Sequence, residues 1–335
     1  MVGKLLKLIT LAGGLALFIW LLMDVDLATV GRNIVHIGLP GGLAIVLAFS
    51  VGFFADVGSW LLMFRSIAIS RLWAWRLLLV QMVGEALNVI TPFGSLGGEP
   101  FKALLLKRHY DVSYREGTAS LLLIQTVNSL AMAPFIITGA VLMLGRGLLP
   151  PVAEKAVLIA ALWITGFMIV VYAALHLRAL VALHQRLGRS RWAESLGRGL
   201  QVMKDIEEHL FYFVRHTPVR FAVSYVLAFL NWLFGAVEIY LIFLFLGHPI
   251  SFADAWTVEA AVVLVRAATF FVPGHLGVQD GAIALMGQAL TGSPEIGLTV
   301  ALLRRGRELV WTGVGLAIGG WFGLKDSPPA TKPGT

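Results

Sequence analysis

Two short stretches rich in glycine and proline interrupt apolar parts of the chain, and each could bind a polar group at membrane depth. The first is Thr91–Pro100 and the second is Pro273–Gly281. Glycine lets a ligand come close to the backbone, and free N–H groups at the start of a helix attract anions. The candidate substrate-binding residues in these stretches are Gly94, Gly97, Gly98, Glu99, Pro273, Gly274, Gly277 and Gln279.

The two stretches also resemble each other. Non-helical backbone inside a membrane is tolerated where protein or a water-filled cavity surrounds it. Paired breaks in two halves of a chain are typical of a midplane site in transporters built from inverted repeats. The alternative is two unrelated loops with glycine at their turns. A shift of 180 residues places Gly94 on Gly274, Gly97 on Gly277 and Glu99 on Gln279.

Ionisable side chains inside apolar segments form a second group of candidates. Such side chains are costly in hydrocarbon and usually face a cavity or a partner. Arginine suits phosphate because its guanidinium can bind two oxygens at once. Glu308 follows Arg304 by four residues and can pair with it on a helix. The candidates for substrate binding are Arg266, Arg304, Arg305, Arg307 and Glu308.

Structural roles remain open for the same side chains. The arginines near Arg305 follow a polar turn, so they could extend to the membrane surface. Arg266 could equally pair with Glu238 or Glu259. Inter-helix hydrogen bonds are the favoured interpretation of Asp56, Asn88, Gln125 and Asn128.

Proton coupling and metal binding can also be assessed from residue types. Glu85 is the candidate for proton coupling, and Glu85 or Glu99 could take a cationic group. His275 stands alone in its stretch, which favours a hydrogen bond in a loop over a metal ligand. The chain has no cysteine, which excludes disulfides, cysteine zinc sites and a thiol nucleophile. We expect no metal and no cofactor.

The composition requires a membrane. The 335 residues are 58% hydrophobic and 13% charged, whereas soluble domains are about 25% charged. Apolar runs of about 20 residues match the thickness of a bilayer, and they are continuous rather than alternating, which favours helices over a β-barrel. The net charge of +7 is attributed to contact with anionic lipids, and no nucleic-acid motif is present.

The pattern predicts an all-α polytopic membrane protein with a single transmembrane domain, 1–323, and a disordered tail, 324–335. A first repeat, 38–145, contains a re-entrant hairpin at 77–106. A second repeat, 221–323, contains another at 252–290. The segment 178–220 is expected to be an amphipathic helix on the membrane surface, or else a solvated linker. The six expected full spans are Leu5–Met23, Gly38–Phe64, Gly117–Leu144, Val152–Leu175, Phe221–Leu246 and Ile296–Gly323.

Orientation follows from the basic residues, which concentrate in cytoplasmic loops. With both termini in the cytoplasm, most of the 26 Lys and Arg residues fall on that side. Arg32, Arg146 and Lys155 fall on the other. The first span lacks a cleavage site and is expected to be retained. The expected location is a bacterial inner membrane.

Three pieces of the sequence resemble the lysylphosphatidylglycerol synthase transmembrane region, also called the flippase-like membrane family. They are Pro92–Glu99, Phe271–Gly281 and Leu302–Leu309, and with the span pattern they cover nearly the whole chain. The residues that match the shared motifs are Gly97, Gly98, Glu99, Pro273, Gly274, Gly277, Gln279, Arg304, Arg305, Arg307 and Glu308.

The resemblance implies a lipid-handling role. The family includes bifunctional proteins that synthesise an aminoacylated lipid and flip it, and stand-alone membrane proteins, some associated with hopanoid biosynthesis. We recognise no soluble aminoacyl-transferase domain, so we expect a stand-alone member without synthase activity. His275 and Asp280 are positions where variation in the family is expected.

Three functions are compatible with these observations. The first is a flippase or transporter that moves an anionic or amphiphilic lipid, with the lipid itself and proteins of lipid biosynthesis as partners. The second is a membrane-embedded enzyme that modifies a lipid; no metal cluster, nucleophile elbow or donor motif supports it. The third is a non-catalytic scaffold. No nucleotide-binding motif is present, which excludes ATP hydrolysis by this chain.

Overall fold

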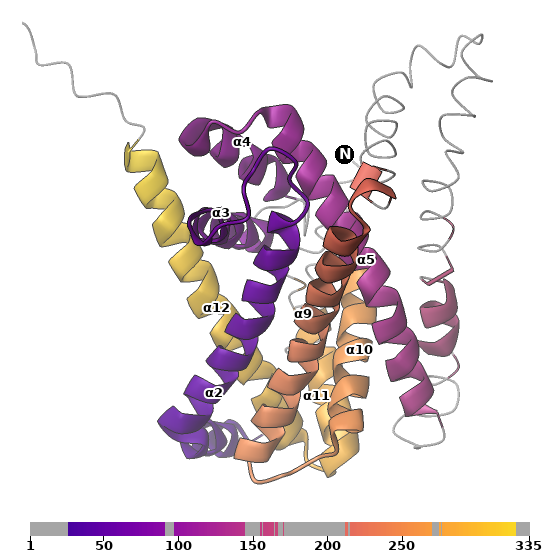
Figure 1. The fold of residues 1–335 in the computed structure, drawn as a ribbon. Coiled ribbons are helices and arrows are strands. Elements are labelled where there is room, and N and C mark those ends of the chain that lie inside the picture. Colours follow the sequence, from indigo (N-terminus) through magenta and orange to yellow (C-terminus); the bar gives the residue numbers. More distant parts are fainter. Residues whose placement is uncertain are drawn as a thin grey trace, which may run out of the picture.

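The computed structural model is helical throughout its described elements. It describes residues 26–90, 97–144, 215–269 and 277–325, positions 212, 213 and 275, and scattered positions between 155 and 170. The expected first span Leu5–Met23, most of the expected segment 178–220 and nearly all of the tail lie outside the described residues. Figure 1 shows the arrangement of the helices.

Three described helices are long and apolar enough to cross a membrane. They match three of the expected spans and confirm an all-α membrane protein. A fourth long helix, α12, carries the charged residues from Arg304 to Glu308 in its middle. The four helices are α2 (Leu27–Leu61), α5 (Tyr114–Met143), α9 (Pro218–Phe245) and α12 (Pro294–Lys325).

The start of α2 differs from the sequence-based expectation, which placed a loop before Gly38. The helix begins at Leu27 because Asp26 caps it, accepting a hydrogen bond from the Ala28 N–H at 2.9 Å. The chain kinks inside α2 at Gly38, which has a φ of 59°. Pro40 follows the kink, where the fixed φ of proline suits a helix start.

Each half of the described fold holds two shorter helices between two long ones. In Figure 1 the connection from α2 to α3 lies at the top of the view, and the connection from α9 to α10 lies at the bottom. The two pairs of short helices are therefore entered from opposite ends of the molecule. The pairs are α3 (Arg71–Ile90) with α4 (Glu99–Tyr110), and α10 (Phe252–Ala268) with α11 (Val278–Thr291).

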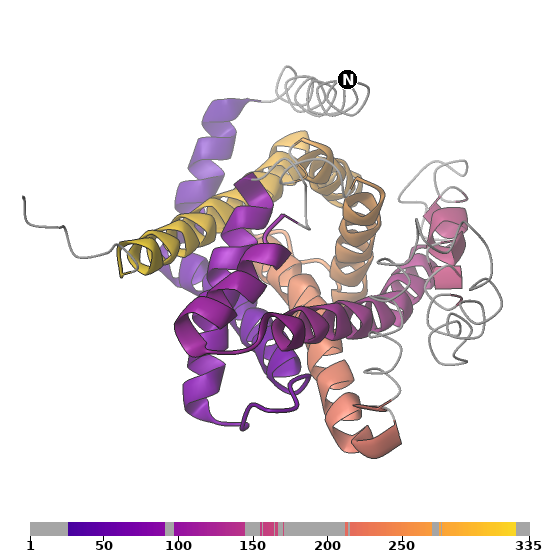
Figure 2. The same cartoon turned by 90° about the horizontal axis from the view of Figure 1, so that it is seen from above.

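The two halves pack against each other in a crossed pattern. The first helices of the halves, α2 and α9, lie side by side. The short helix α3 packs against α12, the last helix of the other half, and α10 packs against α5 in the same way. Figure 2 shows these helices gathered around a shared centre. Residues far apart in the sequence are thereby brought together.

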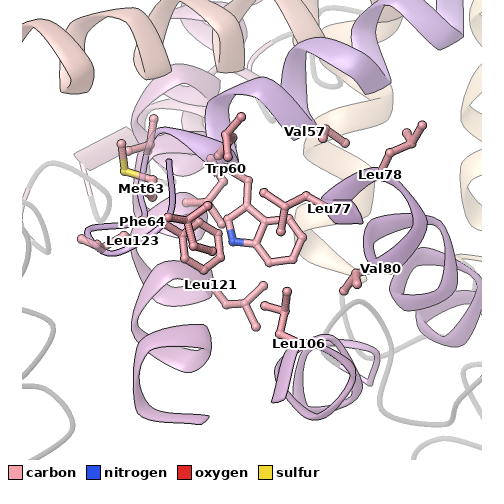
Figure 3. Close-up of a cluster of buried hydrophobic side chains, with 14 of the residues drawn as sticks. Val57, Trp60, Met63, Phe64, Leu77, Leu78, Val80, Leu106, Leu121 and Leu123 are labelled. Atoms are coloured by element: carbon pink, nitrogen blue, oxygen red, sulfur yellow. The ribbon is translucent and has the colours of Figure 1, made fainter. Parts of the chain in front are cut away.

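A hydrophobic cluster around Trp60 holds α3 and α4 against the long helices (Figure 3). Trp60 is 1% exposed, and its Nε1 donates to the Ser120 Oγ at 3.1 Å, which satisfies the polar end of the ring. Leu77 comes from α3 and Leu106 from α4, and both contribute fully buried side chains. This packing fixes the positions of the polar residues on the same helices.

Candidate functional site

Polar side chains from α2, α3, α4 and α5 meet inside the first half. They form a connected network of hydrogen bonds and ion pairs between helices that are otherwise apolar. We call this network the first polar cluster. It consists of Asp56, Gln81, Glu85, Asn88, Glu99, Lys102 and Asn128.

Lys102 is the centre of the first polar cluster. Its Nζ lies 2.9 Å from the Glu85 Oε1 and 2.7 Å from the Glu99 Oε1. The Lys102 side chain is 3% exposed, whereas that of Glu85 is 40% exposed. One ammonium group is therefore shared between two carboxylates, and the Glu85 carboxylate remains accessible.

Asp56 extends the cluster to α2. Its Oδ2 accepts from the Gln81 Nε2 and its Oδ1 from the Asn128 Nδ2, both at 2.9 Å. The same Gln81 nitrogen lies 3.3 Å from the Glu85 Oε1. These bonds agree with the expected role of Asp56 and Asn128 between helices. They also link Asp56 to Glu85 through a single side chain.

Two glycines make room for this arrangement. A Cβ added at Gly84 would lie 2.1 Å from the Cε of Lys102, so the lysine stem runs directly over the α3 backbone. A Cβ at Gly98 would lie 2.0 Å from the Gly84 carbonyl oxygen. The Gly98 N–H donates to the Asn88 Oδ1 at 2.6 Å. The start of α4 is thus anchored on α3.

A second network occupies the other half. We call it the second polar cluster: Glu238, Glu259, Asp280, Arg304, Arg305, Arg307 and Glu308. Arg304 is 4% exposed and binds both carboxylate oxygens of Glu259. Its Nε lies 3.6 Å from the Glu238 Oε2. A Cβ at Gly235 would come within 2.7 Å of Glu259, so this glycine opens the space for the pair.

The other two arginines of α12 are also paired with carboxylates. Arg305 binds Asp280 through Nε at 3.1 Å and Nη2 at 2.7 Å. It also donates to Glu308 at 2.8 Å. Glu308 therefore pairs with Arg305, whereas the sequence suggested a pair with Arg304. Arg307 binds Glu238 with its Nε at 2.8 Å, and its guanidinium lies 3.7 Å from the centre of the Phe49 ring.

Arg266 differs from these arginines. It is partly buried in the last turn of α10 and makes no hydrogen bond or ion pair within the described part of the chain. The expected alternative partners, Glu238 and Glu259, are occupied by arginines of α12.

The glycine-rich stretches are described only in part. Gly94, Pro273 and Gly274 lie outside the described residues. Gly97 and Gly98 are buried beside the start of α4, and Glu99 lies in its first turn. Gly277 caps α11 with a φ of 77°, and Gln279 is buried in the next turn. The described members thus lie at helix starts, as expected.

Sequence analysis missed the central role of Lys102, which was counted among the cytoplasmic basic residues. Its spacing of three residues from Glu99, followed by the apolar run from Ala103, could have indicated a buried pair. Gln81 and Asp280 were also missed as cluster members, because Asp56 and Arg305, which they contact, are each 25 residues away in the sequence. No group of residues in the described parts has the arrangement of a metal site.

The family model for the lysylphosphatidylglycerol synthase transmembrane region matches residues 5–316. The chain belongs to this family. No curated protein and no solved structure matched the chain. Membership confirms the resemblance carried by the glycine-rich stretches and the α12 arginines. It also places the chain in a membrane and links it to a lipid-related role.

Proposed function

We propose that this member of the lysylphosphatidylglycerol synthase transmembrane family moves a lipid with a polar headgroup across a bacterial inner membrane. The observation that carries the proposal is the presence of a buried polar cluster in each half of the described fold. Ionisable groups inside a membrane protein usually mark a substrate or ion pathway. The chain acts as a carrier and not as an enzyme.

Charge pairing supports a pathway for headgroups. Arg304, Arg305 and Arg307 are each bound to carboxylates, and the second cluster is polar, with four carboxylates beside three arginines. In the first cluster, the Glu85 side chain is 40% exposed. A headgroup can pass such a surface without entering hydrocarbon, while its acyl chains contact apolar helix faces.

The helix arrangement supports an inverted repeat. The order of long, short, short and long helices occurs twice, and α3 contacts α12 as α10 contacts α5. The short pairs are entered from opposite ends (Figure 1). We propose that they are re-entrant hairpins in a fold of six full spans with both termini in the cytoplasm. In transporters built from such repeats, the repeats move against each other and expose the site between them to each side of the membrane in turn.

A proteoliposome assay tests the function. Purified protein is reconstituted, and the movement of a fluorescent short-chain phospholipid between leaflets is followed by quenching of the outer leaflet. The wild-type chain should accelerate movement over empty vesicles. Glu99→Gln and Arg307→Gln should reduce the rate at least about tenfold, which corresponds to about 1.4 kcal/mol.

Arg32→Gln is the matched control, because the Arg32 side chain is 70% exposed and belongs to neither cluster. It should leave the rate unchanged. Movement no faster than in empty vesicles would contradict the proposed function. Unchanged rates in both cluster variants would reject the proposed site.

A further inference from the structure

A pocket of about 380 Å³ lies where the connection from α2 to α3 meets the start of α5. Its wall is mostly apolar, but six of the eight described residues that line it have a polar or charged side chain. Such a combination suits the headgroup region of an amphiphile. The lining residues belong to neither polar cluster and are Met63, Arg65, Ser66, Ser113, Arg115, Glu116, Ala119 and Ser120.

Arg65 is positioned in this pocket by an aromatic side chain. Its guanidinium carbon lies 3.6 Å from the centre of the Tyr212 ring and 5.9 Å from that of the Phe213 ring. Stacking on a ring uses the face of the guanidinium, whereas its N–H groups point outward in the plane. Arg65 can therefore donate two parallel hydrogen bonds to a phosphate group while it stays stacked on Tyr212.

Glu116 supplies the carboxylate among the described lining residues, and Ser66 holds it in place. The Ser66 N–H donates to the Glu116 Oε1 at 3.0 Å, and the Ser66 Oγ lies 2.7 Å from both carboxylate oxygens. These bonds tie the α2–α3 connection to the first turn of α5. Two guanidinium groups, of Arg65 and Arg115, and one carboxylate leave a net charge of one positive unit on these residues.

The pocket lies where two apolar spans end. The helix α2 ends at Leu61, just before the pocket residues of the connection, and α5 begins at Tyr114 among the others. Three large side chains close to these residues in the sequence, Ile69, Trp75 and Tyr114, are exposed. Aromatic side chains of this kind are typical of the headgroup level of a bilayer. A lipid therefore has direct access to the pocket, from the cytoplasmic leaflet in the proposed orientation.

We propose that this pocket binds the headgroup of an anionic phospholipid at the membrane surface, separately from any lipid that the protein moves. Arg65 and Arg115 bind the phosphate oxygens, and the apolar part of the wall contacts the glycerol backbone. The single negative charge of a phosphodiester balances the net charge of the lining residues. The bound lipid bridges the α2–α3 connection and α5. This site does not depend on the proposed function.

Protection of a thiol tests the site directly. Because the chain has no cysteine, Ala119→Cys places a unique thiol in the pocket. The full-length variant in detergent is reacted with N-ethylmaleimide while dioleoyl phosphatidylglycerol is added in increasing amounts. The lipid should slow the reaction in a saturable way. Dioleoyl phosphatidylcholine, which has no net charge, should need an at least about tenfold higher concentration for half-maximal protection.

Second substitutions in the Ala119→Cys chain identify the groups that bind the lipid. Arg65→Gln should raise the concentration of phosphatidylglycerol for half-maximal protection at least about tenfold, because charge-assisted hydrogen bonds are lost. Arg65→Lys keeps the charge but not the two parallel donors, so its effect should be intermediate. Arg71→Gln is the matched control, since it removes the same charge from the exposed start of α3 outside the pocket. It should leave protection unchanged.

Three results would overturn the proposal. The first is a thiol that phosphatidylglycerol does not protect. The second is an equal loss of protection in Arg65→Gln and Arg71→Gln, which would show a general attraction of the lipid to basic residues. The third is equal protection by glycerophosphoglycerol, the water-soluble headgroup, which would assign the pocket to a free phosphodiester. Arg65 is exposed, so its variants should unfold at the temperature of the parent chain when lipid is absent.

Discussion

At the scale of single residues, the buried ion pairs determine which charges are available to a ligand. Arg304 is enclosed with Glu238 and Glu259, each of which is nearly inaccessible. Removing one member of a buried pair leaves an uncompensated charge, which costs more than the pair contributes. We therefore regard Arg304 as a structural residue.

Arg304→Met should lower the free energy of unfolding by about 3–5 kcal/mol, because the buried Glu259 carboxylate loses its partner. Denaturant titration in mixed micelles measures this loss. Adding Glu259→Gln to Arg304→Met should recover part of it, since the unpaired charge is then removed. Unfolding of the single variant at the wild-type denaturant concentration would show that the pair is not structural.

At the scale of helices, close backbone contacts keep the two halves together. Gly315 on α12 lies against α3, where an added Cβ would be 2.3 Å from the Met82 carbonyl oxygen. Small residues allow such approach between membrane helices. The contact matters for the site because α3 carries Glu85 and α12 carries the arginines.

Gly315→Ala should lower the free energy of unfolding by about 1–3 kcal/mol, because the helices must separate to fit the methyl group. Gly313→Ala is the matched control on the same helix, since nothing lies within 4 Å of its added Cβ. That change should be neutral or slightly stabilising, as alanine favours helices. Equal effects of the two changes in thermal unfolding would refute the close-contact explanation.

The helices also show what the sequence could predict. The interrupted helices and their glycine-rich starts were predicted because glycine and proline punctuate helices locally. The start of α2 at Leu27 was missed because the expected span began at Gly38, where the helix is kinked. The cap at Asp26 lies before that apolar span. The Lys102 pairs were missed because burial depends on how α3 and α4 pack. Distant pairs such as Arg305 with Asp280 have no local signal.

At the scale of the whole molecule, the proposed transport requires a site that opens to each side of the membrane in turn. In the proposed mechanism this motion takes place between the two halves, which pack in a crossed pattern (Figure 2). Val89 is a suitable position for a probe of this opening. The residue is partly buried and follows Glu85 by four residues on the same face of α3. The chain has no cysteine, so a thiol introduced there is unique.

The most direct measurement is the reaction of Val89→Cys with a membrane-impermeant thiol reagent in right-side-out and inside-out vesicles. The account predicts labelling from both faces, slowed from both by dihexanoyl phosphatidylglycerol. Labelling from one face only, unaffected by the lipid, would contradict a carrier with alternating access.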